Sequence, residues 1–123
     1  MKIRVYYEDT DIGGIVYHTN YIKYCERARS EIFFENGINP LGRGGFIVKN
    51  INANFLATAT LGDLLEVKSS ILEKKKVSIK LLQEVYRDEV KLFSMEILLV
   101  YMSEWKMTKI PDDFLDLFER LNL

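Results

Sequence analysis

The sequence predicts an α+β fold in which an antiparallel sheet packs around one long helix. Three observations lead to this class. A single long stretch with helical periodicity stands early in the chain, and four strand-like segments follow it. The links between the last three segments are too short for parallel crossovers, so we expect antiparallel hairpins. At 123 residues, the chain is expected to form a single domain, 1–123, around one core.

The first two elements are a short strand and the long helix. Charged and apolar residues alternate from Lys2 to Tyr7, which is typical of a strand. The helix is expected from Asn20 to Asn36, because apolar side chains recur there at helical spacing, and Gly37 suits its end. The apolar stripe consists of Tyr21, Cys25, Ala28 and Ile32, widened by Ile22, Tyr24 and Phe33. A stripe this wide predicts a helix that is largely wrapped by other elements.

Four strands and a short helix are expected after a loop at 39–45 that is rich in glycine and proline. The strands cover Phe46 to Leu56, Asp63 to Leu72, Val77 to Tyr86 and Val90 to Met102. On the first of them, the predicted apolar face holds Ile47, Ile51, Ala53 and Phe55. The last is apolar on both faces, which favours a central place in the sheet with both faces covered. The C-terminal helix opens at Pro111 and carries Phe114, Leu117, Phe118 and Leu121.

The composition bounds the class of protein and its location. Hydrophobic residues at 48% and charged residues at 28% are typical of an ordered globular chain, and a net charge of −1 gives no general affinity for nucleic acid. A lone cysteine, Cys25, cannot form an internal disulfide, which favours a reducing compartment. We find no signal-peptide pattern, and no apolar run approaches the ~18 residues of a membrane span. We therefore expect a cytoplasmic protein without an integral membrane segment.

The stretch from Tyr6 to Tyr21 carries more chemistry than a turn needs; it reads Y-Y-E-D-T-D-I-G-G-I-V-Y-H-T-N-Y. Carboxylates precede a glycine pair and a helix start, whose unpaired N–H groups can stabilise an oxyanion. A carboxylate there can attack a carbonyl group or activate a water molecule. A solvated acidic turn that caps the helix explains the same spacing, so the residues alone leave both interpretations open.

Metal and histidine chemistry are disfavoured by the number of ligands. Asp9 and Asp11 match the first positions of a calcium-binding EF-hand, but Asn20 stands where the bidentate glutamate belongs. His18 is the only histidine, which argues against a Ser-His-Asp triad or a multi-histidine metal site. Cys25 lies on the apolar stripe and is expected to be inert packing.

A lysine run, Lys74-Lys75-Lys76, separates two of the expected strands. A solvated hairpin tip explains this run. Alternatively, its ammonium groups hold the phosphates of a nucleotide-bearing substrate, to which Arg43 and Lys49 would add. The sequence leaves the choice open.

The acidic stretch, together with E-R-A-R at 26–29, resembles the YbgC-type branch of the 4-hydroxybenzoyl-CoA thioesterase family. The resemblance covers the chain nearly end to end. It implies the hotdog fold, a five-stranded antiparallel sheet wrapped around one long helix, with a short C-terminal helix in addition. It also implies hydrolysis of an acyl-CoA thioester to a free acid and CoA without metal or organic cofactor. Subunits of the family pair through their sheets, and a homotetramer built as a dimer of dimers is expected.

The resemblance also assigns roles to individual residues. Asp11, the second acid of D-x-D-x-x-G, would be the nucleophile or the general base, and the backbone N–H of His18 would polarise the thioester carbonyl. Lys75 and Lys76 would hold CoA phosphates, often across a subunit interface. Further residues of the motif that would shape the pocket are Tyr7, Thr10, Gly14, Val16, Tyr17 and Asn20. A second hotdog branch places a catalytic glutamate on the helix, but Asp11 makes Glu26 or Glu31 unnecessary in that role.

Two rival functions fit the same residues. One is a non-catalytic protein that holds an acyl group or a partner on the hotdog dimer. The other is a thioesterase that acts on acyl groups attached to acyl carrier protein. Relatives are often associated with the Tol–Pal cell-envelope system, which implies a functional link to that system. Acyl chain length and pathway are not readable from the sequence.

Overall fold

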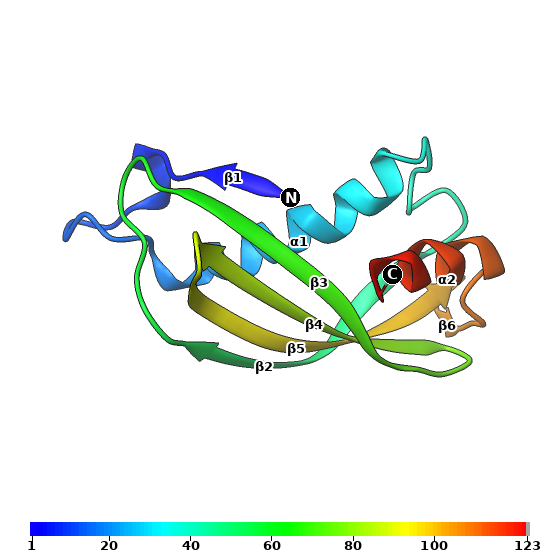
Figure 1. The fold of residues 1–123 in the computed structure, drawn as a ribbon. Coiled ribbons are helices and arrows are strands. Elements are labelled where there is room, and N and C mark those ends of the chain that lie inside the picture. The colour runs from blue at the N-terminus through cyan, green and yellow to red at the C-terminus, as the bar shows by residue number, and fades with distance from the viewer. Residues whose placement is uncertain (123) are drawn as a thin grey trace.

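A computed structural model describes residues 1–122 and has the predicted α+β fold (Figure 1). One antiparallel sheet runs in the order β1-β3-β4-β5-β2, with β6 paired to β5. The strands are β1 (Lys2–Arg4), β2 (Gly45–Phe55), β3 (Leu64–Lys74), β4 (Ser78–Arg87), β5 (Val90–Ser103) and β6 (Lys106–Met107). The helices are α1 (His18–Phe34) and α2 (Asp112–Glu119), and single 3-10 turns form η1 (Tyr7–Asp9) and η2 (Arg120–Asn122).

The long helix α1 lies against one face of the sheet, over β3 and β4 (Figure 1). The predicted stripe is the buried one, and its innermost side chains are Tyr21, Tyr24, Cys25, Ala28 and Phe33. The opposite side of the helix, including Lys23 and Arg27, is exposed. The expectation of a largely wrapped helix is therefore met on one side only within a single protomer.

Strand β5 lies inside the sheet, between β4 and β2, but the middle of the strand order is β4, so the predicted central place is met only in that β5 is not an edge strand. The face toward the helix is buried and consists of Phe93, Met95, Ile97, Leu99 and Tyr101. On the other face Leu92 and Val100 are buried, Leu98 is half-buried and Glu96 is exposed. The outer face is therefore covered only in part.

Strand β2 departs from the prediction at Ile47. The register with β5 shifts around Lys49, which is a β-bulge, and an extra residue reverses the direction of the side chains that follow. Phe46, opposite Tyr101, therefore shares the helix-facing side with Ile51, whereas Ile47 points to the outer face. The prediction that Ile47 shares a face with Ile51, Ala53 and Phe55 is wrong for Ile47 alone.

The sheet differs from the prediction at one end and keeps an open edge. The two-residue β6 was not predicted; it follows a turn in which Glu104 and Trp105 have φ of +51° and +66°. The strand β2 pairs with β5 on one side and with no described strand on the other. Its exposed apolar side chains include Ile47, Val48 and Phe55. A long edge strand with apolar side chains invites pairing with another chain.

Candidate active site

The acidic loop between η1 and α1 is closed by short-range hydrogen bonds that hold Asp11 at its tip. The Asp11 N–H donates to the Ile15 carbonyl at 2.9 Å, and the Asp11 Oδ1 accepts the Gly13 N–H at 2.8 Å. Gly14 has a φ of +80°, a left-handed conformation that glycine adopts at little cost. A Cβ at Gly13 would stand 3.2 Å from the Asp11 carboxylate. The glycine pair thus lets the chain fold tightly around an exposed Asp11.

Asp9, two residues earlier, points the other way and anchors the loop. Its side chain is buried, and its Oδ2 accepts the Tyr6 N–H at 2.9 Å. Its carbonyl accepts the Tyr17 N–H at 2.9 Å and the Asn20 side-chain amide at 2.8 Å. The Tyr24 hydroxyl lies close by, and burial, reinforced by the Asp9 carboxylate, raises its pKa. Asp9 therefore ties the loop to the start of α1.

His18 is the first residue of α1 and follows Tyr17, whose backbone is still extended. The first N–H groups of a helix lack partners within it, and no described group accepts the His18 N–H. The partial positive charge of the helix start adds to this donor. The imidazole packs against the rings of Tyr17 and Phe55, with centroids 4.6 and 5.9 Å away. The helix start can therefore donate a hydrogen bond to a carbonyl oxygen.

The other predicted pocket residues divide into two groups. Val16 and Asn20 are buried and hold the loop against the core, so their side chains do not line an open pocket. The Val16 N–H donates to the Ala59 carbonyl at 2.9 Å, which fixes the exit of the loop. Tyr7, Gly14 and Tyr17 are exposed around Asp11. Thr10 donates its hydroxyl to the Tyr7 carbonyl at 2.9 Å and thus shapes the loop rather than a pocket.

The predicted CoA-binding lysines lie at the far end of the molecule. They stand in the hairpin between β3 and β4, opposite the acidic loop along the sheet (Figure 1). Lys75 pairs with Glu73 at 3.1 Å, and Lys74 pairs with Glu119. Lys76 has no ion pair with any residue between 1 and 122. A single protomer therefore does not bring Lys75 or Lys76 together with Asp11.

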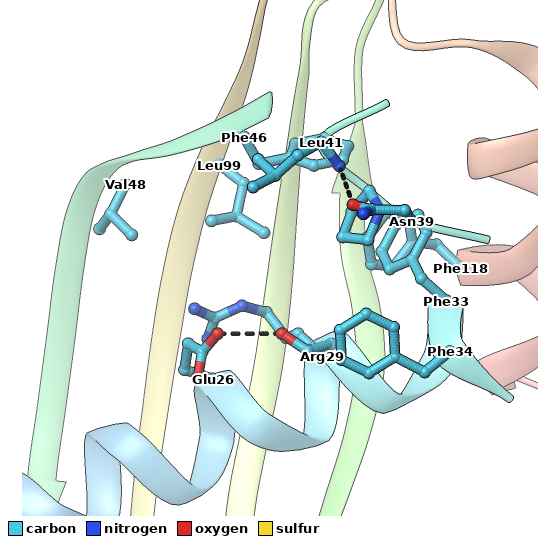
Figure 2. Close-up of a pocket in the computed structure, with 12 residues that line it drawn as sticks. Glu26, Arg29, Phe33, Phe34, Asn39, Leu41, Phe46, Val48, Leu99 and Phe118 are labelled. Carbon is cyan, nitrogen blue, oxygen red and sulfur yellow. Dashed lines mark hydrogen bonds between the residues drawn. The ribbon is translucent and has the colours of Figure 1, made fainter. Parts of the chain in front are cut away.

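A pocket of about 540 Å³ lies away from the acidic loop, between α1, the 39–41 loop and the sheet (Figure 2). In Figure 2, Arg29 and Glu26 rise from α1 and face Val48 and Leu99 on the strands. Sequence reasoning gave Arg29 no role. The sequence feature that could have pointed to Arg29 is Gln83, the polar residue on the otherwise apolar face of β4. A buried polar side chain needs a partner, and the Arg29 guanidinium donates a hydrogen bond to Gln83.

Two features bear on cofactor and membrane binding. Within residues 1–122, no group of three or more His, Cys, Asp or Glu side chains is placed to hold a metal ion. None of the described helices has the length and apolar character needed to span a bilayer.

Solved structures define the class of protein that this fold and loop represent. A probable thioesterase from Bartonella henselae matches with a TM-score of 0.84 and 29% sequence identity, over 90% of this chain and 97% of that one. The fold is the hotdog fold of thioesterases, as the resemblance implied.

Sequence comparison then gives the family. The thioesterase superfamily model matches residues 13–94. An acyl-CoA thioesterase YbgC from Helicobacter pylori is 52% identical over 87 residues, which cover 70% of this chain and 65% of that protein's own length. An acyl-CoA thioester hydrolase YbgC from Escherichia coli O157:H7 is 36% identical over 110 residues, 85% of this chain and 82% of that protein. The chain belongs to the thioesterase superfamily, and the predicted resemblance to its YbgC-type branch is confirmed.

Proposed function

We propose that this chain hydrolyses acyl-CoA thioesters to a free carboxylic acid and CoA. One observation carries the proposal: an exposed Asp11 on a closed glycine loop precedes a helix start whose His18 N–H is unpaired among the described groups. The names of the Helicobacter and Escherichia relatives support the substrate class.

Asp11 and His18 would divide the chemistry between them. The His18 N–H, backed by the helix dipole, donates to the thioester oxygen and stabilises negative charge as the carbonyl carbon becomes tetrahedral. Asp11 either attacks that carbon to give a mixed anhydride, which water then hydrolyses, or removes a proton from the attacking water. In both routes the C–S bond breaks and the CoA thiolate leaves and is protonated. Both routes need an accessible carboxylate, which the exposed loop tip supplies.

A second copy of the chain would complete the site. On the inner face of β2, the exposed fractions are 48% for Val48, 37% for Ile51 and 49% for Phe55, which is unusually bare for a helix-facing surface. Two-fold pairing of β2 edges, with both helices on the same side of the joint sheet, is antiparallel. Because Phe55 contacts His18, this pairing sets the His18 end of one protomer beside the Val48 end of its partner.

The same pairing bears on the lysines. It brings the β3–β4 hairpin of one protomer to the end of the dimer that holds the partner's Asp11 (Figure 1). Lys75 and Lys76 would then hold CoA phosphates across the interface. A dimer of such dimers, a cytoplasmic location and a link to the Tol–Pal system remain predictions from the resemblance.

The test is thiol release from a panel of acyl-CoA esters of increasing chain length, with the same acyl groups on acyl carrier protein in parallel. Turnover of the CoA esters supports the proposal. Turnover of the carrier-protein esters alone would give the activity to the carrier-protein alternative. Tight acyl-CoA binding without thiol release would favour the non-catalytic binding protein.

A further inference from the structure

The pocket beside the second half of α1 contains a guanidinium that is held in a fixed position. Arg29 Nη1 donates to Gln83 Oε1 at 2.9 Å. The Gln83 side chain is 0% exposed, and its Nε2 donates to the Cys25 carbonyl at 2.9 Å and to Ser69 Oγ at 3.0 Å. The amide is therefore held from both sides by groups of the core. This arrangement orients the Arg29 fork toward the pocket before any ligand arrives.

Arg29 forms no ion pair within residues 1–122. Among residues 1–122, no carboxylate lies within 4.0 Å of its guanidinium, and Gln83 is its one hydrogen-bond partner. Burial lowers the pKa of Arg29, and the nearby Cys25 and Glu26 oppose this shift. Glu26 is itself exposed, and its Oε1 accepts the Ser30 hydroxyl at 2.9 Å. A partly desolvated cation without an ion pair costs stability, and an anionic ligand would offset that cost.

The remainder of the pocket wall is mainly apolar. Its apolar residues are Phe33, Phe34, Pro40, Leu41, Phe46, Val48, Leu99 and Phe118, and Glu26, Ser30 and Asn39 line it beside Arg29. A volume of about 540 Å³ falls within the range of small-molecule sites, roughly 300–1,000 Å³. Such a wall around a positioned guanidinium fits an apolar chain that ends in a carboxylate, because the planar fork can hold both carboxylate oxygens. A neutral hydroxyl would leave the charge of Arg29 unbalanced.

The position of the pocket links it to the reaction. Val48 and Phe46 line it, and antiparallel pairing of the β2 edges sets this end of one protomer beside the partner's His18. We propose that Arg29 binds the far carboxylate of an acyl group whose thioester lies at the partner's Asp11, so that the preferred substrates are ω-carboxyacyl-CoA thioesters. This inference rests on the proposed thioesterase function and adds a substrate class to it.

The test compares thioesters that differ only in the terminal carboxylate. Matched pairs of about four to ten carbons, such as adipyl-CoA and hexanoyl-CoA, are hydrolysed by the wild type, Arg29→Met and Arg27→Met. Arg27 is exposed on the same helix and outside the pocket, so its variant is the matched control. In Arg29→Met, kcat/KM for the ω-carboxy substrate should fall at least about tenfold relative to its plain partner, as expected for a lost charged hydrogen bond. The ratio should hold in Arg27→Met.

The alternative outcomes have defined meanings. A ratio that is unchanged in folded Arg29→Met, or that falls equally in Arg27→Met, overturns the inference while leaving the thioesterase proposal intact. If Arg29→Met does not fold, Arg29→Lys replaces it, and a ratio as high as that of the wild type refutes the need for the fork. If the wild type releases no thiol from any ester, the thioesterase proposal fails. Calorimetry with free adipate and hexanoate then decides the site: tighter adipate binding that Arg29→Met or Arg29→Lys abolishes supports it, and equal binding overturns it.

Discussion

Mutation of the two acids of the D-x-D motif should lower stability to different extents, and Asp9→Ala is the informative variant. Asp9 is 8% exposed, and its carboxylate accepts the Tyr6 N–H at 2.9 Å. A hydrogen bond to a charged group contributes about 1.5–3 kcal/mol, and its loss leaves the Tyr6 N–H without this acceptor. We expect the free energy of unfolding to fall by about 1.5–3 kcal/mol, or roughly 5–15 °C in Tm for a chain of this size.

The matched control is Asp11→Ala, because Asp11 is exposed and bonds only the neighbouring Gly13 N–H. Its expected cost is below about 1 kcal/mol. Urea unfolding measures the free energy of unfolding of both variants. One fixed protomer concentration is used, because association between copies adds to the apparent stability. Equal costs for the two variants, or a cost below about 0.5 kcal/mol for Asp9→Ala, would refute the division into an anchoring and a reacting acid.

Two further predictions concern titration and reactivity. Asp63 accepts hydrogen bonds from the Thr60 N–H and Arg87, each at 2.9 Å, and these lower its pKa below the usual 3.8. Because the pKa of Asp63 is depressed in the folded state, its stabilising effect is present above about pH 4 and is lost as the pH falls through the folded-state pKa. The difference in unfolding free energy between the wild type and Asp63→Asn should therefore shrink in that range. A difference that does not change with pH would contradict this prediction. Burial raises the pKa of the Cys25 thiol to about 12, so a thiol reagent at neutral pH should label the protein only after unfolding, and rapid native labelling would refute its inert role.

The sequence was sufficient for the elements whose side chains repeat with a regular period. The stripe of α1 and the two apolar faces of β5 are local patterns, and they predicted the buried helix face and an interior position for β5. The bulge at Lys49 is not local in this sense, since it arises from register with β5, and it moved Ile47 to the outer face. A period-two pattern cannot show where an extra residue is inserted.

The candidate site was predictable to the level of the loop but not of its internal division. Residues two apart on an extended segment share one side, so a strand pattern would have put Asp9 and Asp11 together. Instead Asp9 ends the 3-10 turn η1 and Asp11 lies in the loop beyond it, which separates the two side chains. The Asp9 carboxylate is held inward by the Tyr6 N–H, a contact that exists only in the folded loop. The role of Arg29 was not predictable, because its hydrogen-bond partner Gln83 lies on β4, 54 positions further along the chain. No spacing rule relates two residues so far apart in the sequence.

The central claim is that the Asp11 carboxylate carries out thioester hydrolysis, and the most direct test is the steady-state kinetics of the Asp11→Asn variant. The substitution keeps the size of the side chain and removes the ionised carboxylate, which the proposed chemistry requires at the loop tip. Thiol release from the best acyl-CoA ester should fall at least about a hundredfold in kcat, with unfolding free energy and oligomeric state unchanged. A folded Asp11→Asn protein that turns over at the wild-type rate would contradict the assignment of Asp11 and, with it, the proposed mechanism.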